Sequence, residues 1–171
     1  IAAVVSRLES DLFACMFIEE HRMYMNRMDE RAREAQRLIN FPDPDIRPAR
    51  TALDADIYQL MPFVGQEHGE ALMRELHHSR STRWNPIFMD VVPEGGSKRV
   101  GIKAVMRAYG LDRSETMAFG DGQNDIEMLR HAAVGIAMGN AAEEVRRTAD
   151  YVTASIDDDG VALALRHFGL I

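Results

Sequence analysis

Apolar and polar residues follow two different patterns along the chain, and the first pattern gives way to the second near Pro93. Before it, runs rich in β-forming residues are separated by segments with helical spacing of apolar positions. The predicted strands are 12–18, 21–26, 56–64 and 85–92, the predicted helices 2–10, 27–38 and 67–78, and a loop with three prolines spans 41–48. Because only Glu19-Glu20 separates the first two strands, they are expected to form a hairpin. This part predicts an α+β unit with a mostly antiparallel sheet.

After Pro93, helices and strands alternate one by one. The predicted helices are 97–109, 124–132, 141–147 and 159–167, and the predicted strands are 115–119, 134–138 and 151–154. Such alternation indicates a parallel sheet with crossover helices, so residues 1–92 and 93–171 are expected to form two domains. Three strands are few for a doubly wound sheet, and the place of a central strand would remain an apolar edge. The α/β unit is therefore expected to be incomplete.

Composition narrows the class of protein. The 171 residues are 46% hydrophobic, which is enough for a packed core, and no apolar run approaches the ~18 residues of a membrane span. The single cysteine, Cys15, points to a reducing compartment, with the cytoplasm as the default. The net charge is −7 and the basic residues are scattered, which disfavours a nucleic-acid partner. Because the first residue is Ile1 rather than Met, the chain is expected to begin inside a longer one.

The strongest chemical motif is the segment 117–125, an apolar strand that runs into Gly120-Asp121-Gly122-Gln123-Asn124-Asp125 and then a helix. In an open α/β sheet the ligand crevice lies at the carboxyl ends of the strands. A carboxylate there suits Mg²⁺, which takes one or two protein carboxylates and keeps water and phosphate oxygens as its other ligands. Asp121 is thus a candidate metal ligand, and Asn124 can reach the same ligand. The alternative is an acidic loop that only caps the helix.

A second motif, Gly95-Gly96-Ser97-Lys98, opens the helix predicted over 97–109. A cation in the first turn of a helix opposes the helix dipole. Its presence beside a glycine-rich loop indicates an anion that the lysine and the free backbone amides bind together. For an isolated lysine the alternative is a solvated surface position.

Together with Ile136–Ala141, these motifs resemble the third and fourth motifs of the haloacid dehalogenase superfamily, and within it the Cof-type sugar-phosphate phosphatases. The resemblance rests on specific motifs over 93–171 and on position and pattern over 1–92. It implies that Lys98 binds the phosphate and acts in catalysis, and that Asp121 is a catalytic carboxylate that ligates Mg²⁺. It further implies that Asn124 contacts the phosphoryl group and that Asp125 supports the outer shell of the metal.

The resemblance also assigns residues 1–92 to a cap that covers the active site and selects the substrate. Its candidate specificity residues are Glu20, His21 and Arg83, although a solvated surface role is the alternative for each. Asn140-x-x-Glu143 matches a capping box, so Asn140 is expected to cap the helix that follows.

The family's nucleophile, written Asp-x-Asp-Gly-Thr after a first strand, has no counterpart in the chain. Asp43-Pro44-Asp45 has the spacing but follows a predicted helix. The segment 157–160, Asp-Asp-Asp-Gly, follows a strand but comes after the metal motif, and Asp159 is expected to cap backbone amides there. The segment with the nucleophile is therefore expected to be absent from these residues, and the chain alone is expected to be inactive.

The resemblance implies a Mg²⁺-dependent phosphatase for small phosphate monoesters, with a phosphorylated metabolite of the sugar-phosphate class as its ligand. One alternative is a non-catalytic module that binds or senses a sugar phosphate. A second is the phosphorylation domain of a P-type cation pump, which shares the Gly-Asp-Gly-x-Asn-Asp pattern. That domain should be followed by membrane helices, whereas this chain ends in an amphipathic helix.

Overall fold

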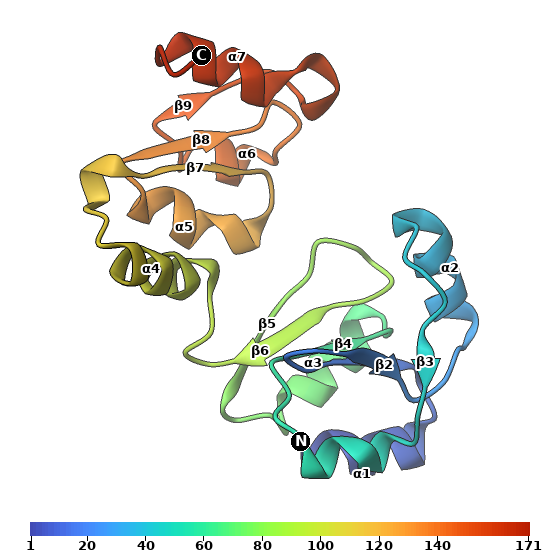
Figure 1. Ribbon diagram of the computed structural model, residues 1–171. Coiled ribbons are helices and arrows are strands. Elements are labelled where there is room, and N and C mark those ends of the chain that lie inside the picture. Colours follow the sequence, from blue (N-terminus) through green and yellow to red (C-terminus); the bar gives the residue numbers. More distant parts are fainter. The chain divides into compact units, whose positions relative to one another are not determined.

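The computed structural model describes residues 1–171, which form two compact units, Ile1–Gly95 (unit 1) and Gly96–Ile171 (unit 2) (Figure 1). None of the helices has the length and apolarity needed to span a bilayer. The fold class is the predicted one, an α/β chain in which an α+β part with a mostly antiparallel sheet precedes a part with a parallel sheet.

Unit 1 is built on a six-stranded sheet with the order β3-β2-β1-β4-β6-β5. Its strands are β1 (Cys15–Ile18), β2 (Met23–Met25), β3 (Asp45–Ile46), β4 (Gln59–Pro62), β5 (Ser79–Thr82) and β6 (Asp90–Pro93). Its helices are α1 (Ala2–Asp11), α2 (Glu30–Ile39) and α3 (Gln66–Met73), with a 3-10 helix over Ala49–Asp54. The expected β1–β2 hairpin is present, with Phe17 opposite Tyr24. Every pairing is antiparallel except that of β2 with β3.

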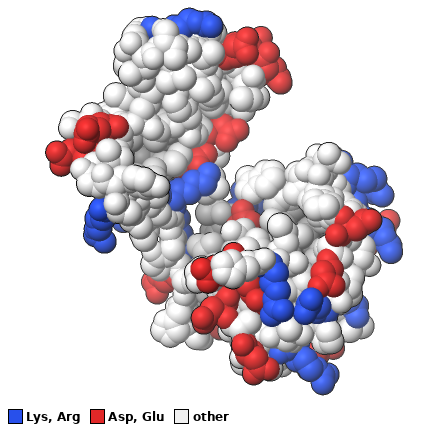
Figure 2. Space-filling view, viewed as in Figure 1, with Lys and Arg blue, Asp and Glu red and all other residues white.

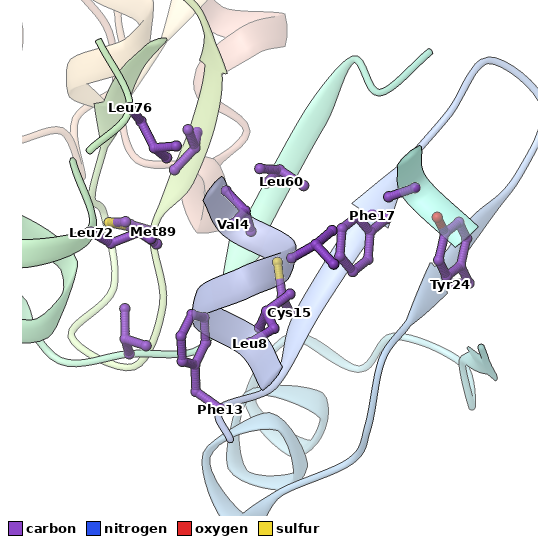
Figure 3. Packing of buried hydrophobic residues seen from close by; sticks show 14 residues of the cluster. Val4, Leu8, Phe13, Cys15, Phe17, Tyr24, Leu60, Leu72, Leu76 and Met89 are labelled. Carbon is purple, nitrogen blue, oxygen red and sulfur yellow. The ribbon is translucent and has the colours of Figure 1, made fainter. Parts of the chain in front are cut away.

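The two faces of this sheet carry separate apolar clusters, because successive side chains of a strand point to opposite sides. Phe17, Leu60 and Val91 belong to the first cluster, which packs against α1 and α3 (Figure 3). Met16 and Met61 point the other way, into a second cluster that α2 covers. Asp29 starts α2 by accepting a hydrogen bond from the amide of Ala32, at 2.9 Å. Unit 1 thus buries apolar side chains on both faces of its sheet.

Unit 2 has a three-stranded parallel sheet with the order β7-β8-β9. Its strands are β7 (Met117–Gly120), β8 (Val134–Ala137) and β9 (Tyr151–Val152). Its helices are α4 (Lys98–Tyr109), α5 (Ile126–His131), α6 (Glu143–Arg146) and α7 (Gly160–His167), and 3-10 turns lie at Arg113–Glu115, Gln123–Asp125 and Ile156–Asp158. β7 forms one edge of the sheet, so one row of its backbone groups has no strand partner.

The packing of unit 2 leaves an open apolar groove beside this edge strand. The groove has a volume of about 520 Å³ and lies between α4 and β7, with Ile102, Val105 and Met117 among its lining residues. α4 has no buried residue, and Val105 on its apolar face is 53% exposed. The apolar face predicted for this helix therefore exists but is not covered by the other elements of unit 2.

Three predicted elements of unit 1 were wrong in detail. The helix expected over 67–78 ends at Met73, and the chain turns to bring β5, which was not predicted, beside β6. Ser-Arg-Ser-Thr lacks apolar alternation, so pairing with β6 decides its conformation. Residues 85–89, expected as strand, are irregular, and the proline-rich loop over 41–48 contains the short β3.

Candidate active site

The turn after β7 is held together by one buried carboxylate. Asp125 is 3% exposed, and its Oδ2 accepts hydrogen bonds from the amides of Asp121 and Gly122, each at 3.0 Å. A Cβ at Gly120 would lie 2.5 Å from the Cβ of Asp125, so only glycine allows this close approach. The glycines of the motif therefore permit a tight turn, and the second aspartate fixes it.

The other oxygen of the same carboxylate accepts from Lys98. The Lys98 ammonium donates to Asp125 Oδ1 in an ion pair across 27 positions of sequence. Lys98 is the first residue of α4, which Ser97 caps by accepting from the amide of Val100. The lysine side chain is half exposed, so it contacts both the buried carboxylate and solvent. Lys98 and the turn that carries Asp121 are thus brought together around Asp125.

Asp121 itself is exposed and lies directly after the carboxyl end of β7. Its Oδ2 accepts from Nδ2 of Asn140 at 3.1 Å, and Oδ1 of Asn140 accepts from the amide of Ile156 at 3.1 Å. Asn140 follows β8 and Ile156 follows β9. One asparagine therefore ties together the loops at the carboxyl ends of all three parallel strands.

The predicted capping role of Asn140 is wrong. α6 begins after Ala142, whose position provides no side-chain cap. The chain instead bends tightly at Gly139, where a Cβ would lie 2.7 Å from the amide nitrogen of Ser155. This close approach directs Asn140 toward the strand ends. Its position after a parallel strand was the signal in the sequence that could have identified it as a member of the site.

Asn124 lies in the same turn, in the 3-10 helix Gln123–Asp125. Its side chain folds back over Gly122, where a Cβ would lie 2.6 Å from Asn124 Oδ1. The three polar residues predicted around this turn therefore lie within one loop, and Lys98 joins them through Asp125.

The donor set is compatible with part of a magnesium site. The structure contains no cluster of three or more His, Cys, Asp or Glu side chains that could hold a metal ion. Mg²⁺ needs only one or two protein carboxylates, and the exposed Asp121 offers one. Asp125 is engaged by two amides and an ammonium group, so within these residues it holds the turn and orients Lys98.

In unit 1, two of the predicted specificity residues lie at the tip of the β1–β2 hairpin. Glu20 and His21 are mostly exposed, with Oε1 and Nε2 3.8 Å apart. The neighbouring Glu19 pairs with Arg22 at 2.6 Å and closes the turn. Glu20 and His21 are therefore the outward-facing side chains of this hairpin.

Arg83 lies in a different setting from these two residues. Its guanidinium donates to the backbone carbonyls of Val64, Gly65, Asn85, Pro86 and Phe88, at 2.9 to 3.4 Å. Burial, with a smaller contribution from Arg31, lowers the pKa of this guanidinium. Arg83 thus holds two irregular loops of unit 1 together.

Two segments share the aspartate spacing of the nucleophile motif, Asp43-Pro44-Asp45 and 157–160. Asp43 accepts from Gln36 at 2.8 Å, and Asp45 belongs to β3 and pairs with Arg47. Asp159 precedes α7 with a left-handed backbone and makes no capping hydrogen bond, so its predicted capping role is wrong. A Cβ at position 160 would lie 2.1 Å from the carbonyl oxygen of Ala154, so only glycine fits at this tight corner.

Charges are interspersed rather than segregated on the surface. Figure 2 shows Lys and Arg side chains mixed with Asp and Glu side chains on the visible face of each unit. No large patch made only of Lys and Arg is visible on this face.

A model of the haloacid dehalogenase-like hydrolase family matches residues 2–165. The chain belongs to this family. The family prediction made from the Lys98 loop and the turn at 120–125 is thereby confirmed. The fold is also that of a solved HAD subclass IIB sugar phosphatase, BT4131, with a TM-score of 0.89 and 37% identity over 99% of this chain.

Two relatives illustrate the range of similar proteins. An uncharacterized protein in the pdhA 5'region of Geobacillus stearothermophilus is 47% identical over 92 residues, 54% of this chain and 97% of that protein. The 5-amino-6-(5-phospho-D-ribitylamino)uracil phosphatase YitU of Bacillus subtilis (strain 168) is 32% identical over 117 residues, 68% of this chain. The chain covers 42% of YitU and 65% of the BT4131 structure.

Proposed function

We propose that these 171 residues are part of a Mg²⁺-dependent phosphatase that hydrolyses small phosphate monoesters, with sugar phosphates as the substrate class. The observation that carries this proposal is the joint arrangement of the Lys98 ammonium and the Asp121 turn around the buried Asp125. It gathers a cation and an exposed carboxylate at the carboxyl ends of parallel strands. Two of the similar proteins are named as a sugar phosphatase and as a 5-amino-6-(5-phospho-D-ribitylamino)uracil phosphatase, and these names support a phosphate ester as the ligand.

Each polar residue of the loop has a task in this proposal. Lys98 and Asn124 bind phosphoryl oxygens, on which negative charge accumulates in the transition state. Asp125 orients Lys98, and Asn140 orients Asp121 through the hydrogen bond to its carboxylate. Asp121 would hold Mg²⁺, which supplies Lewis-acid stabilisation of the phosphoryl charge when it is bound.

The nucleophile must come from residues outside these 171, because the chain has no Asp-x-Asp-Gly-Thr strand. The unpaired edge of β7 and the apolar groove beside it offer a place for a further strand in the parallel sheet. An aspartate at the carboxyl end of that strand would face the same crevice as Asp121. On this proposal the 171 residues alone do not turn over substrate, and the longer protein forms an aspartyl-phosphate.

Unit 1 is proposed to act as the cap that selects the leaving group. Glu20 and His21 are its exposed candidates, whereas Arg83 would contribute by holding the loops around it. The protein is further proposed to act in the cytoplasm on a soluble metabolite, consistent with its single, buried cysteine.

The test is a phosphatase screen of the longer protein, with its upstream segment, over a panel of sugar phosphates with and without Mg²⁺. Asp121→Ala should lower turnover by about 10²-fold or more, the scale seen when one electrostatic group of an active site is removed. Asp159→Ala is the matched control, since this exposed aspartate also follows a strand of unit 2 and should leave turnover unchanged.

Two outcomes would contradict the proposal. Unchanged turnover in Asp121→Ala removes the metal role, and Mg²⁺-dependent turnover by the 171 residues alone removes the need for an outside nucleophile. Saturable binding of a sugar phosphate by the longer protein, with no turnover of any ester, would favour the non-catalytic binding module. The observation that favours this non-catalytic function is the lack of a nucleophile motif in these residues.

A further inference from the structure

The second face of the sheet in unit 1 is covered only in part. Its apolar cluster joins Met16 and Met25 to α2 and to Phe88 of the irregular loop. The next row of side chains on this face crosses β2, β1 and β4 as Met23, Ile18 and Gln59, which the strand register places side by side. Met23 is 56% exposed. On this face of the sheet, the side chains around Met16 are therefore buried, whereas Met23 is exposed to solvent.

A polar network lies at the open end of this face. Val91 belongs to the first cluster, so Asp90, its neighbour on β6, points to the opposite face together with Gln59. Gln59 Nε2 donates to Asp90 Oδ1 at 2.7 Å, and Trp84 Nε1 donates to Asp90 Oδ2 at 3.0 Å. The Asp90 carboxylate thus orients both the Gln59 amide and the Trp84 indole by accepting a hydrogen bond from each.

Trp84 is held in place yet remains exposed. Its ring meets Phe88 edge-on, with centroids 4.9 Å apart and an interplanar angle of 85°. Phe88 is fully buried, whereas Trp84 is 52% exposed. An indole restrained at its nitrogen and along its edge loses little further freedom when a ligand stacks on it. The exposed tryptophan is therefore a pre-oriented flat surface beside two hydrogen-bonding groups.

We propose that Trp84, Asp90 and Gln59 bind the polyhydroxylated part of the ligand, with the indole against its carbon skeleton and the amide and carboxylate on its hydroxyl groups. This inference rests on the proposed function, in which the ligand is a sugar phosphate, and names the residues that recognise the sugar. A hydroxyl group both donates and accepts, so it can donate to a carboxylate and pair with an amide that does either. An aromatic surface with a few fixed polar groups is the usual composition of a small-molecule site.

The choice of a polyol over a phosphate group follows from the hydrogen-bonding groups of the network. Gln59 contributes an amide and Asp90 a carboxylate, which only accepts hydrogen bonds, and a phosphomonoester dianion has no O–H group to donate to it. The hydroxyl groups of a polyol can donate to the carboxylate and can either donate to or accept from the amide. A nucleobase could also stack on the indole, and the experiment separates that outcome from the proposed one.

The single tryptophan of these 171 residues makes the first test direct. Intrinsic fluorescence of the 171-residue chain should change saturably when a hexose phosphate or a pentose phosphate is added, at up to about 10 mM for a complex of millimolar affinity. Inorganic phosphate should cause no such change. Absence of any change with the sugar phosphates, an equal change with inorganic phosphate, or a change with nucleoside monophosphates alone overturns the proposal.

The second test uses turnover by the longer protein. Trp84→Ala should lower kcat/KM for the preferred sugar phosphate about tenfold and leave that for an aryl phosphate nearly unchanged. Trp84→Phe keeps the contact with Phe88 and should retain part of the sugar preference, and Tyr109→Ala, which removes an aromatic ring that is 77% exposed, is the matched control.

These outcomes separate the two proposals. If aryl and sugar phosphates are hydrolysed by the wild type and the ratio of their kcat/KM values is the same in Trp84→Ala, the phosphatase stands and the sugar site is overturned. If no phosphate ester is hydrolysed but the Trp84 fluorescence still responds to sugar phosphates, the sugar site stands and the phosphatase fails.

Discussion

Unit 1 (Ile1–Gly95) and unit 2 (Gly96–Ile171) differ in how completely they bury their apolar side chains. In unit 1 both faces of the sheet carry a cluster, and Phe17, Phe63 and Phe88 are fully buried. In unit 2 the buried cluster consists largely of alanines, and α4 buries no residue at all. The comparison teaches that regular secondary structure does not by itself indicate a closed core. Unit 2 has well-formed strands and helices beside a groove that no other element of unit 2 fills.

The largest effect is expected in the core of unit 1. Phe17 is fully buried and stacks on Tyr24 with centroids 5.1 Å apart, so Phe17→Ala should cost about 3–5 kcal/mol of unfolding free energy. Urea unfolding followed by Trp84 fluorescence measures this loss. Burial raises the pKa of the Cys15 thiol, so its reaction with a thiol reagent should become fast only when unit 1 opens. If Phe17→Ala leaves the urea midpoint unchanged, Phe17 is not packed as described.

A smaller loss is expected at the turn of unit 2. Gly120→Ala places a methyl group 2.5 Å from Asp125 Cβ and should destabilise unit 2 by about 1–3 kcal/mol. Gly101→Ala is the matched control, because Gly101 lies within α4 with no atom within 4 Å of its Cβ position. That change should stabilise by about 0.5–1 kcal/mol. Thermal unfolding followed by circular dichroism compares the two, and equal effects would contradict the close approach at Gly120.

The groove predicts an effect that depends on the length of the chain. Val105→Ala should change the stability of the 171 residues by less than about 0.5 kcal/mol, because Val105 is 53% exposed. In the longer protein the same change should cost about 1–2 kcal/mol if a further strand and its flanking residues cover the groove. Denaturation of both proteins with and without the substitution is the measurement. A small effect in both would mean that the groove stays open.

An effect slightly smaller than that of Val105→Ala in a longer protein is expected at Asn140. Asn140→Ala removes two hydrogen bonds, to Asp121 and from Ile156, and should cost about 0.5–1.5 kcal/mol in stability. If the proposed phosphatase function holds, turnover should fall as well, because Asp121 loses its orienting partner. Gln123→Ala, which removes only an exposed bond to Glu144, is the control. Equal behaviour of the two variants would assign Asn140 to the surface rather than to the site.

Much of the architecture could be predicted because it depends on local patterns. The alternation of helices and strands after Pro93 predicted all three parallel strands, and the hairpin of β1 and β2 followed from two apolar runs with a polar turn. β5 could not be predicted, because Ser79–Thr82 is polar throughout and becomes a strand only by pairing with β6. Local propensity is weak there, and a long-range partner decides the conformation.

The candidate site divides in the same way. The spacing of Gly120, Asp121 and Asp125 after an apolar strand identified the turn from sequence, because a tight, acidic strand-to-helix turn needs those residue types in that order. The contact of Lys98 with Asp125 and the bridge of Asn140 from Asp121 to Ile156 join segments that lie 16 to 27 positions apart. Sequence alone therefore determined which residues could take part and roughly where each element runs. Only the tertiary structure decided which side chains meet, because the packing of distant strands and helices, and not local spacing, sets those distances.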